Sequence, residues 1–476
     1  MGVGLAERVV ELEVENAQLR ELIVRLEARI VELERQLGKH SGNWSLPPSA
    51  DSQAQREARP APTKRRQGQR RQGKQPGAPG AHLERVATPD RTILHRPNAC
   101  RGCGAGLGDA PVVGVESRQV FDLPDRRAEV TDHRAEKRRC RCGCETTGVF
   151  PAEATAPACW GPQVRAVAVY LLVRHHLPIA RVAEILSDLV GASVSTGWLA
   201  GLTGQATDGL GSFIDDVKDR LTGEPVAHAD ETSCRVAGVK QWFHVLSTAL
   251  ITLLAVHTKR GRTATDAIGV LPAFRGVLVH DRWAPYWTYP GIRHAICNAH
   301  IVRDLAAIGE ADRYRGWAGA MVELLIDAKR RCDFSRYHAR PRLARGQQQW
   351  VRARYDTLVA AFFAAYPTPA DGWPKGSYDR DAHNLAVALR DHRDEVLRFT
   401  RDLNVPFDNN QAERDLRMAK LQQKVSGSFR TEHGAHRFAT VRSYIETGRK
   451  HGHNPLDLLT QLFNAHPWTI PTSATA

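Results

Sequence analysis

Residues 276–283 read Gly-Val-Leu-Val-His-Asp-Arg-Trp, a short apolar run that ends in an aspartate. An apolar run of this length, opened by glycine, predicts a buried strand over residues 276–280 that ends at Asp281. Upstream, residues 225–230 read Pro-Val-Ala-His-Ala-Asp and predict a short strand over residues 225–229 that ends at Asp230. We therefore expect two strands that each present an aspartate at the end.

The residues between these aspartates predict how the two strands are joined. Residues 241–247 and 250–258 are rich in β-formers and predict an antiparallel meander, and residues 263–271 predict a helix. Three strands, a helix and a fourth strand follow the order of a ribonuclease H-like sheet, in which strands one and four lie side by side. Asp230 and Asp281 would then face one site. Two divalent cations beside a scissile phosphate need such carboxylates, and Mg²⁺ (or Mn²⁺) prefers oxygen ligands.

A third carboxylate is expected from a later helix. Residues 404–417 predict a helix that is capped by Asn409 or Asn410 and carries Glu413 in its first turn. A structural interpretation is equally open on these residues alone, because Asn410-x-x-Glu413 also resembles a capping box. Three other acids are rival ligands: Asp415, Glu432 and Glu446.

Cysteines cluster in one part of the chain. The chain has nine, and five of them lie between Cys100 and Cys144. Cys100-Arg-Gly-Cys103-Gly is a zinc-knuckle sequence, and Cys140-Arg-Cys142-Gly-Cys144 follows it. Two such pairs predict one structural Zn²⁺ held by Cys100, Cys103, Cys140 and Cys142, with Cys144 as the alternate ligand. The surrounding ribbon-like module, with strands expected over residues 119–123 and 129–133, is too small to fold well without metal.

The first 40 residues carry a heptad repeat. Leucine recurs every seven residues from Leu5 to Leu33, and Asn16 occupies one of the matching a positions. In a parallel homodimer, Arg8 would meet Glu13, Glu15 would meet Arg20, and Arg29 would meet Glu34. This pattern predicts a two-stranded parallel coiled coil whose register is fixed by Asn16.

Charge indicates a polyanionic partner. The chain has a formal charge of +14, and the linker after the heptads is rich in Pro, Gly, Gln, Ser and Arg. A cationic segment of this kind is either a solvated spacer or an arm along DNA phosphates. The residues expected to contact phosphates there are Lys64, Arg65, Arg66, Arg70, Arg71 and Lys74. Four more cations follow Glu413 along the last predicted helix: Arg414, Arg417, Lys420 and Lys424.

A helical segment precedes the strands. Helices are predicted over residues 161–177, 178–189 and 195–203, with a Val190-Gly191 turn between the last two. The pattern fits a DNA-binding helix-turn-helix and an ordinary helical hairpin equally well. No segment reaches the roughly 18 apolar residues that a membrane helix needs, so we expect a cytoplasmic protein without a membrane partner.

Four motifs, taken in order, resemble one known family. They are Ala229-Asp230-Glu231-Thr232, His280-Asp281-Arg282-Trp283-Ala284-Pro285-Tyr286, Cys297-Asn298-Ala299-His300 and Asn410-Gln411-Ala412-Glu413-Arg414. Their combination is similar to the insertion sequence 66 family of bacterial transposases. The resemblance implies a DDE-type catalytic domain of ribonuclease H-like fold. It also implies that Asp230, Asp281 and Glu413 form the catalytic triad and that a helical insertion separates the last two acids.

These expectations divide the chain into eight parts. They are a coiled coil (1–40), a basic linker (41–95), a zinc-binding module (96–150), a helical DNA-binding region (151–222), the first part of an α/β catalytic core (223–302), a helical insertion (303–402), the last part of the core (403–430) and a helical tail (431–476).

The predicted function is transposition, with cleavage and transfer of DNA strands at the ends of a mobile element. The expected partners are double-stranded DNA at the element ends and the target, a second copy of the chain, and accessory proteins of the element. Two other functions remain open. One is a DNA-binding regulator with an inactive core, and the other is a ribonuclease H-like nuclease without strand transfer. We place Cys297 and His300 in a structural role beside the active site, because a pair alone offers too few ligands for a metal.

Overall fold

The computed structural model describes residue 20 and residues 85–122, 128–151, 153–374 and 376–471. The heptads of the predicted coiled coil and the six cationic linker residues lie outside the described residues, apart from residue 20. From residue 85 onward, the described residues divide into one compact unit up to Glu129 and a second that begins at Val130.

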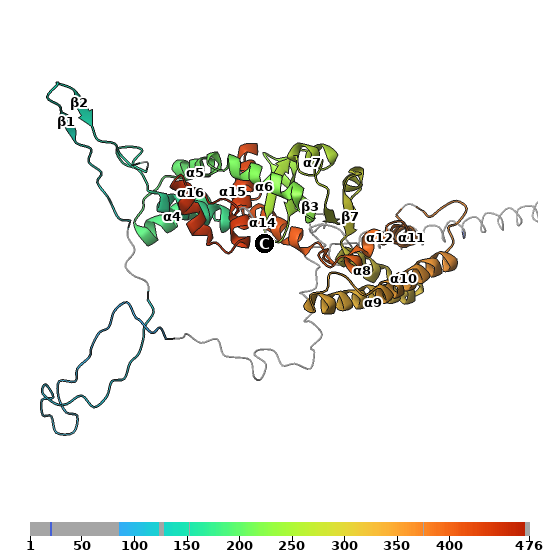
Figure 1. The fold of residues 1–476 in the computed structure, drawn as a ribbon, viewed down its shortest axis with the longest axis horizontal. Helices are drawn as coiled ribbons and strands as arrows, with labels where there is room; N and C mark the ends of the chain where they lie inside the picture. The colour runs from blue at the N-terminus through green and yellow to red at the C-terminus, as the bar shows by residue number, and fades with distance from the viewer. Residues whose placement is uncertain (1–19, 21–84, 123–127, 152, 375, 472–476) are drawn as a thin grey trace, which may run out of the picture. The chain divides into compact units, whose positions relative to one another are not determined.

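The larger unit is built on a mixed sheet of five strands in the order β5-β4-β3-β6-β7 (Figure 1). The strands are β3 (Val226–Val236), β4 (Val239–Ser247), β5 (Thr252–His257), β6 (Val277–His280) and β7 (Arg293–Ile296). β3, β4 and β5 form an antiparallel meander, whereas β6 and β7 run parallel to β3. The predicted first and fourth strands, β3 and β6, are therefore neighbours.

A tight turn sets the register of the meander. Val236 pairs with Val239, so only Ala237 and Gly238 connect β3 to β4. Both have positive φ, +49° and +79°, which is the conformation of a two-residue hairpin turn that matches the twist of the strands. This turn fixes which β4 residue pairs with each β3 residue, so that Asp230 pairs with Val245.

Helices that precede the meander in the sequence and helices near the C-terminus share one hydrophobic core with it. Residues predicted as a separate helical region and as a C-terminal tail thus pack on the same sheet. On α14, Ala412, Leu416 and Ala419 recur at helical spacing and are buried. The elements are α3 (Pro162–Val169), the π-helical η2 (Tyr170–Arg174), α4 (Ile179–Val190), α5 (Thr196–Asp208), α6 (Gly211–Gly223), α7 (Arg262–Ile268), α14 (Asn410–Ser426), α15 (Glu432–Lys450) and α16 (Pro455–Phe463).

The inserted helices form a second core against β6 and β7. Val277 and Val279 of β6 belong to this cluster, whereas Leu278 belongs to the first one, as the alternation of side chains along a strand requires. Figure 1 shows α9, α10 and α11 grouped together beyond β7. The elements are the 3₁₀ turn η3 (Ala284–Thr288), α8 (Asn298–Ile308), α9 (Asp312–Tyr337), α10 (Arg345–Ala365), α11 (Tyr378–Asp391), α12 (Arg393–Val396) and α13 (Arg398–Arg401).

The predicted helix-turn-helix segment is helical as expected. Gly191 ends α4 in the left-handed conformation, and the Ser195 hydroxyl accepts a hydrogen bond from the Trp198 N–H to cap α5. The helix predicted over residues 161–177 is shorter, because its α-helical part ends at Val169 and the π-helical turn after it ends at Arg174.

The strands predicted over residues 119–123 and 129–133 were wrong for every described residue in them. Val120 and Val130 are 88% and 91% exposed, so their apolar side chains have no surface on which a strand could pack. The strands that do occur nearby are β1 (Lys137–Arg139) and β2 (Glu145–Thr147), which pair as a hairpin on either side of Cys140–Cys144.

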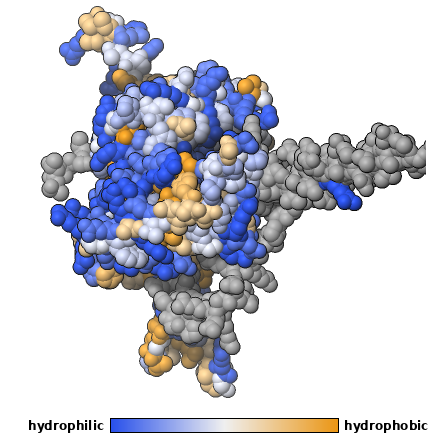
Figure 2. All heavy atoms as spheres, turned by 90° about the vertical axis from the view of Figure 1, so that its right-hand side faces the viewer, coloured by the Kyte–Doolittle hydropathy of each residue, from blue (hydrophilic) through white to orange (hydrophobic). Residues whose placement is uncertain are grey.

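None of the described helices combines the length and apolar character needed to cross a lipid bilayer. The face in Figure 2 is mostly hydrophilic and is broken by an apolar patch near its centre.

Candidate active site

Asp230 lies on the central strand β3, and Asp281 directly follows the neighbouring strand β6. Asp230 is inside β3, not at its end, so that part of the prediction was wrong; β3 continues because residues up to Val236 pair with β4. The parallel pairing of β3 with β6 nevertheless stops at His228 opposite Val279. Asp281 follows β6 directly, so the same register carried two residues further sets Asp230 opposite Asp281. Both aspartates are partly exposed at this edge.

Negative charge accumulates around Asp230. The pKa of its carboxyl is raised well above the ordinary value, first by burial and then by the nearby charges of Glu231 and Asp281. Lys420 of α14 acts in the opposite direction but does not cancel these effects. A bound dication would remove this repulsion, which makes the donor set suitable for one.

Glu231, the next residue, is committed to protein contacts. Its Oε1 accepts hydrogen bonds from Arg260 Nε and Nη2 at 2.9 and 2.6 Å, and its Oε2 accepts one from the Tyr286 hydroxyl at 2.6 Å. The side chain is 1% exposed. The sequence motifs contain Glu231 and Tyr286, but their pairing was not predicted. It ties β3 to the turn that follows Asp281.

A strained turn follows Asp281. Arg282 has φ +76°, a left-handed conformation that non-glycine residues seldom adopt, and such strain gathers at functional sites. Its Nη2 lies 2.5 Å from Asp304 Oδ2 of α8, and Asp281 Oδ1 accepts the Trp283 N–H at 3.1 Å. The turn therefore holds the Asp281 side chain at the carboxyl end of β6.

Asn409 anchors the start of α14 to the sheet. Its amide Nδ2 donates to the carbonyl of Ala229 at 2.8 Å, and its Oδ1 lies 2.9 Å from His228 Nδ1. Its backbone N–H donates to Cys297 Sγ at 3.2 Å. Because Ala229 precedes Asp230, these bonds hold the first turn of α14 beside the β3 aspartate. The sequence indicated Asn409 only as a helix cap.

Glu413 does not form a capping box. Asn409 is the N-cap residue and makes no side-chain cap, and Glu413 lies four positions after it rather than three. The carboxylate is partly exposed, and its Oε1 lies 3.7 Å from His300 Nε2. Both Glu413 and Asp281 raise the pKa of His300, although burial lowers it more. His300 therefore lies close to both acids.

Cys297 and His300 support this corner of the site. His300 Nδ1 lies 3.1 Å from Cys297 Sγ, and burial raises the pKa of that thiol to about 12. With Glu413 they form the trio of possible metal ligands found among the described residues, with all three ligand atoms within 4.8 Å of one another.

The rival acids have other partners. Asp415 Oδ2 lies 2.7 Å from Lys450 Nζ and also accepts from Thr252 and Gln411. Glu446 contacts three arginines, and Glu432 accepts from Gln241 at 2.7 Å. None of these three lies beside the two aspartates in the contacts that the structure describes.

The four cations predicted on α14 separate into two groups. Arg417, Lys420 and Lys424 follow Glu413 at spacings of four, seven and eleven residues and share its side of the helix. Arg414 is exposed, donates to Gln411 Oε1 at 2.7 Å and lines a cavity on another side.

The cysteine cluster is divided between the two compact units. Cys100 accepts the Gly104 N–H on its carbonyl, and hydrogen bonds from the backbones of Cys103 and Gly102 lower the pKa of its thiol. In the other unit, the backbone of Cys144 and then the thiols of Cys140 and Cys144 lower the pKa of Cys142. Each half thus favours thiolates, while the complete four-ligand site, and the choice between Cys142 and Cys144, stay predictions.

Comparison with known families gives three matches. Residues 157–437 match the model described as Transposase IS66 family, and residues 97–144 match the zinc-finger binding domain of transposase IS66. Residues 5–84 match a family of unknown function. The search of curated proteins finds no match.

Proposed function

The chain belongs to the IS66 family of transposases, and from this premise we propose that it cleaves and transfers DNA strands with Asp230, Asp281 and Glu413. The observation that carries the proposal is the convergence of β3, the end of β6 and the first turn of α14. Asn409 fixes the position of α14 relative to β3, because its side chain bonds to Ala229, the residue before Asp230.

We assign the core to the ribonuclease H-like class. The strand order supports this assignment, since an antiparallel meander is continued by two parallel strands next to its first strand. The long insertion between β7 and α14 packs with β6 and β7 in the second hydrophobic core, so it can extend the chain without separating the acids.

The three carboxylates would hold two divalent cations, for which Mg²⁺ is the best candidate. When bound, such cations activate an attacking oxygen and stabilise the leaving oxygen of the scissile phosphate. The fit rests on the donor set, because Asp230 and Asp281 raise each other's energy when both are charged.

The protein's own residues set the geometry. Glu231 and Tyr286 hold β3 and the Asp281 turn together, Asn409 holds α14, and His300 lies against Glu413. Arg417, Lys420 and Lys424 supply positive charge on the same side of α14, where a DNA backbone would approach.

Cleavage of a labelled duplex carrying the element end tests this function. Wild-type protein with Mg²⁺ should nick the end and join the freed 3′-hydroxyl to a second duplex. Asp230→Asn and Asp281→Asn should lose both steps and still bind the duplex. Nicking without joining would instead favour the nuclease. Binding without either step by folded wild-type protein, with Mg²⁺ and every partner of the element present, would favour the regulator.

We further propose that Cys100, Cys103, Cys140 and Cys142 hold one structural Zn²⁺ in the IS66 zinc-finger domain. The lowered pKa values of Cys100 and Cys142 support this, because thiolates are the ligands of zinc. Purified reduced protein should contain about one zinc per chain. Cys100→Ser should lose it, whereas Cys159→Ser, which lies outside the cluster, should not. Equal zinc content in the two variants would contradict the assignment.

The predicted coiled-coil homodimer, the phosphate contacts of the basic linker and the DNA contact of the α4–α5 pair remain proposals of the same kind. Double-stranded DNA is the partner that the family implies.

A further inference from the structure

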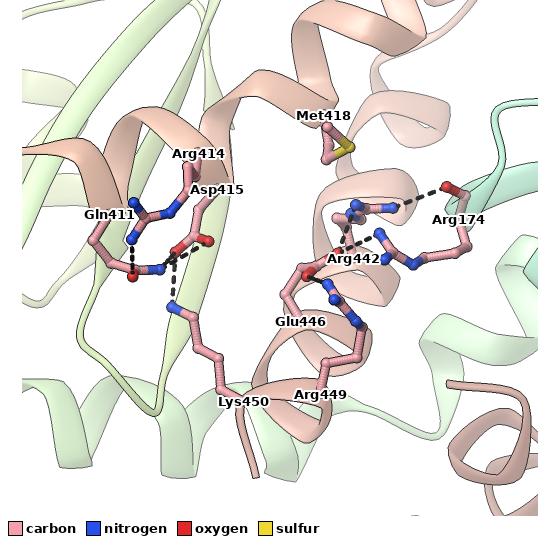
Figure 3. A pocket seen from close by; sticks show the side chains of 9 residues that line it. All are labelled: Arg174, Gln411, Arg414, Asp415, Met418, Arg442, Glu446, Arg449 and Lys450. Atoms are coloured by element: carbon pink, nitrogen blue, oxygen red, sulfur yellow. Dashed lines mark hydrogen bonds and ion pairs between the residues drawn. The ribbon is translucent and has the colours of Figure 1, made fainter. Parts of the chain in front are cut away.

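A cationic cavity lies on the far side of α14 from Glu413. It has a volume of about 380 Å³ and is bounded by α14, α15 and η2 (Figure 3). Five positive side chains line it, against two carboxylates. The cations are Arg174, Arg414, Arg442, Arg449 and Lys450.

Both carboxylates of the cavity are already neutralised. Glu446 is shared by Arg174, Arg442 and Arg449, at 3.1, 2.5 and 2.7 Å. Asp415 pairs with Lys450 at 2.7 Å. Figure 3 shows these two groups on opposite sides of the cavity, with Met418 above the space between them. Three guanidinium groups on one carboxylate leave an excess of positive charge facing that space.

Arg442 is the most deeply buried cation of the cavity lining. Its side chain is fully buried, and burial lowers the pKa of its guanidinium to about 10. Its Nη1 donates to the carbonyls of Val173 and Arg174, and its Nη2 faces Glu446, whereas its Nε has no hydrogen-bond partner among the described residues. Because this Nε is enclosed by protein, Arg442 contributes positive charge behind the wall of the cavity, and the exposed side chains of Arg414 and Arg449 supply the accessible donors.

The chemistry of the lining selects phosphate. Guanidinium groups present planar pairs of donors that match phosphate oxygens. Eight of the nine lining residues are polar or charged, and Met418 is the exception. The rim is accessible, because Arg414 is exposed and the Arg449 side chain is 43% exposed. The deep part is rigid, because Arg442 and Glu446 are one helical turn apart and paired.

We propose that this cavity binds a phosphate group, supplied by the backbone of the DNA that the transposase holds. The proposal rests on DNA being the partner, as the proposed function has it, but not on the catalytic triad. Gln411, Asp415 and Met418 recur on α14 at spacings of four and three residues, on the side opposite Glu413. The bound phosphate therefore belongs to DNA outside the active site, and the cavity anchors the duplex at a second point.

The test is DNA binding by the full chain in EDTA, so that it does not depend on cleavage. Arg414→Gln/Arg449→Gln should weaken binding of a duplex carrying the element end. It should also flatten the plot of log affinity against log salt concentration by about one, the change expected for one lost phosphate contact. Arg380→Gln, an exposed arginine of α11 outside the cavity, removes one charge without touching it and should leave the slope unchanged. Arg414→Gln alone gives the same test at the rim if the double variant does not fold.

Inorganic phosphate distinguishes the two sources of the group. At constant ionic strength, phosphate should raise the melting temperature of the wild-type protein more than chloride does, and it should do so less for the double variant. A phosphate effect with an unchanged DNA slope would assign the cavity to free phosphate and overturn the DNA part of the proposal. No phosphate effect and no change in slope would show an internal ion network only and overturn the proposal entirely. Failure of the proposed triad is distinguishable from these outcomes, because it would appear in the cleavage assay of Asp230→Asn and Asp281→Asn and not in measurements made in EDTA.

Discussion

Carboxylates on the two sides of α14 have different partners. On one side, Asp415 pairs with Lys450 at 2.7 Å, and nearby Glu446 is surrounded by three arginines. On the other side, the ion-pair contact that Glu413 makes among the described residues is with His300, at 3.7 Å, and the charge of Asp281 also acts on that histidine. The same helix thus carries one acid that is neutralised by the protein and another that is not.

This difference separates structural acids from candidate metal ligands. A buried acid that stabilises the fold needs a cation or several donors, and Asp415 has both. An acid that binds a dication must instead leave its oxygens available and accept repulsion from its neighbours. Asp230 shows this repulsion in its raised pKa.

The sharpest way to break the comparison is to remove one charge from Glu413. Glu413→Gln should reduce strand cleavage by at least about 1,000-fold and leave folding and DNA binding near normal, because among the described residues its carboxylate has only the 3.7 Å ion-pair contact with His300. Cleavage of the labelled element end measures this.

Glu432→Gln is the matched control, since Glu432 also lies in the first turn of a helix and was a rival third acid. It should cleave normally, because glutamine can still accept the bond from Gln241. Near-normal cleavage by Glu413→Gln would remove Glu413 from the triad.

Asp415→Asn should give the opposite result. Removing one partner of a largely buried pair leaves Lys450 without its counter-ion, which should lower the free energy of unfolding by about 3 kcal/mol. Below the unfolding temperature, the Mg²⁺ concentration needed for half-maximal cleavage should not change. Urea denaturation and a Mg²⁺ titration on one preparation measure both effects. A large shift in that Mg²⁺ concentration would place Asp415 among the metal ligands.

The sequence predicted the positions of the two aspartates better than it predicted the residues that surround them. Apolar runs that end in Asp230 and Asp281 are local signals, and the adjacency of β3 and β6 followed from the order of the elements. The end of β3 was misplaced because its last six residues pair with β4 rather than β6, and pairing partners are not a local property.

The supporting residues were missed for the same reason. The bonds of Asn409 to Ala229 and of Tyr286 to Glu231 span 180 and 55 residues, so no spacing rule detects them. Glu413 could not be separated from a capping box until the helix start was known, because moving the cap by one residue changes the interpretation. The strands expected near the cysteines failed because alternation predicts a strand only where a surface is available to cover it.

The smallest expected effect sharpens the comparison through pH. The raised pKa of Asp230 means that the folded protein binds a proton there more tightly than the unfolded chain, whose aspartates titrate near 3.9. Its contribution to stability is therefore complete at low pH and is lost as pH rises through the raised pKa. Partial exposure and salt weaken the effect, so it should be smaller than that of Asp415→Asn.

Asp230→Asn isolates this contribution, since it keeps the shape of the side chain and removes the titration. In EDTA, the variant should become more stable relative to wild type as pH rises from 4 to 8, as measured by urea denaturation. Mg²⁺ should restore stability to the wild type at pH 8 and do little for the variant, because neutralising the acids is what the cation contributes there. Parallel pH profiles for the two proteins, with equal stabilisation by Mg²⁺, would show that the charge near Asp230 is already balanced by the protein. The acids on both sides of α14 would then be neutralised by the protein itself.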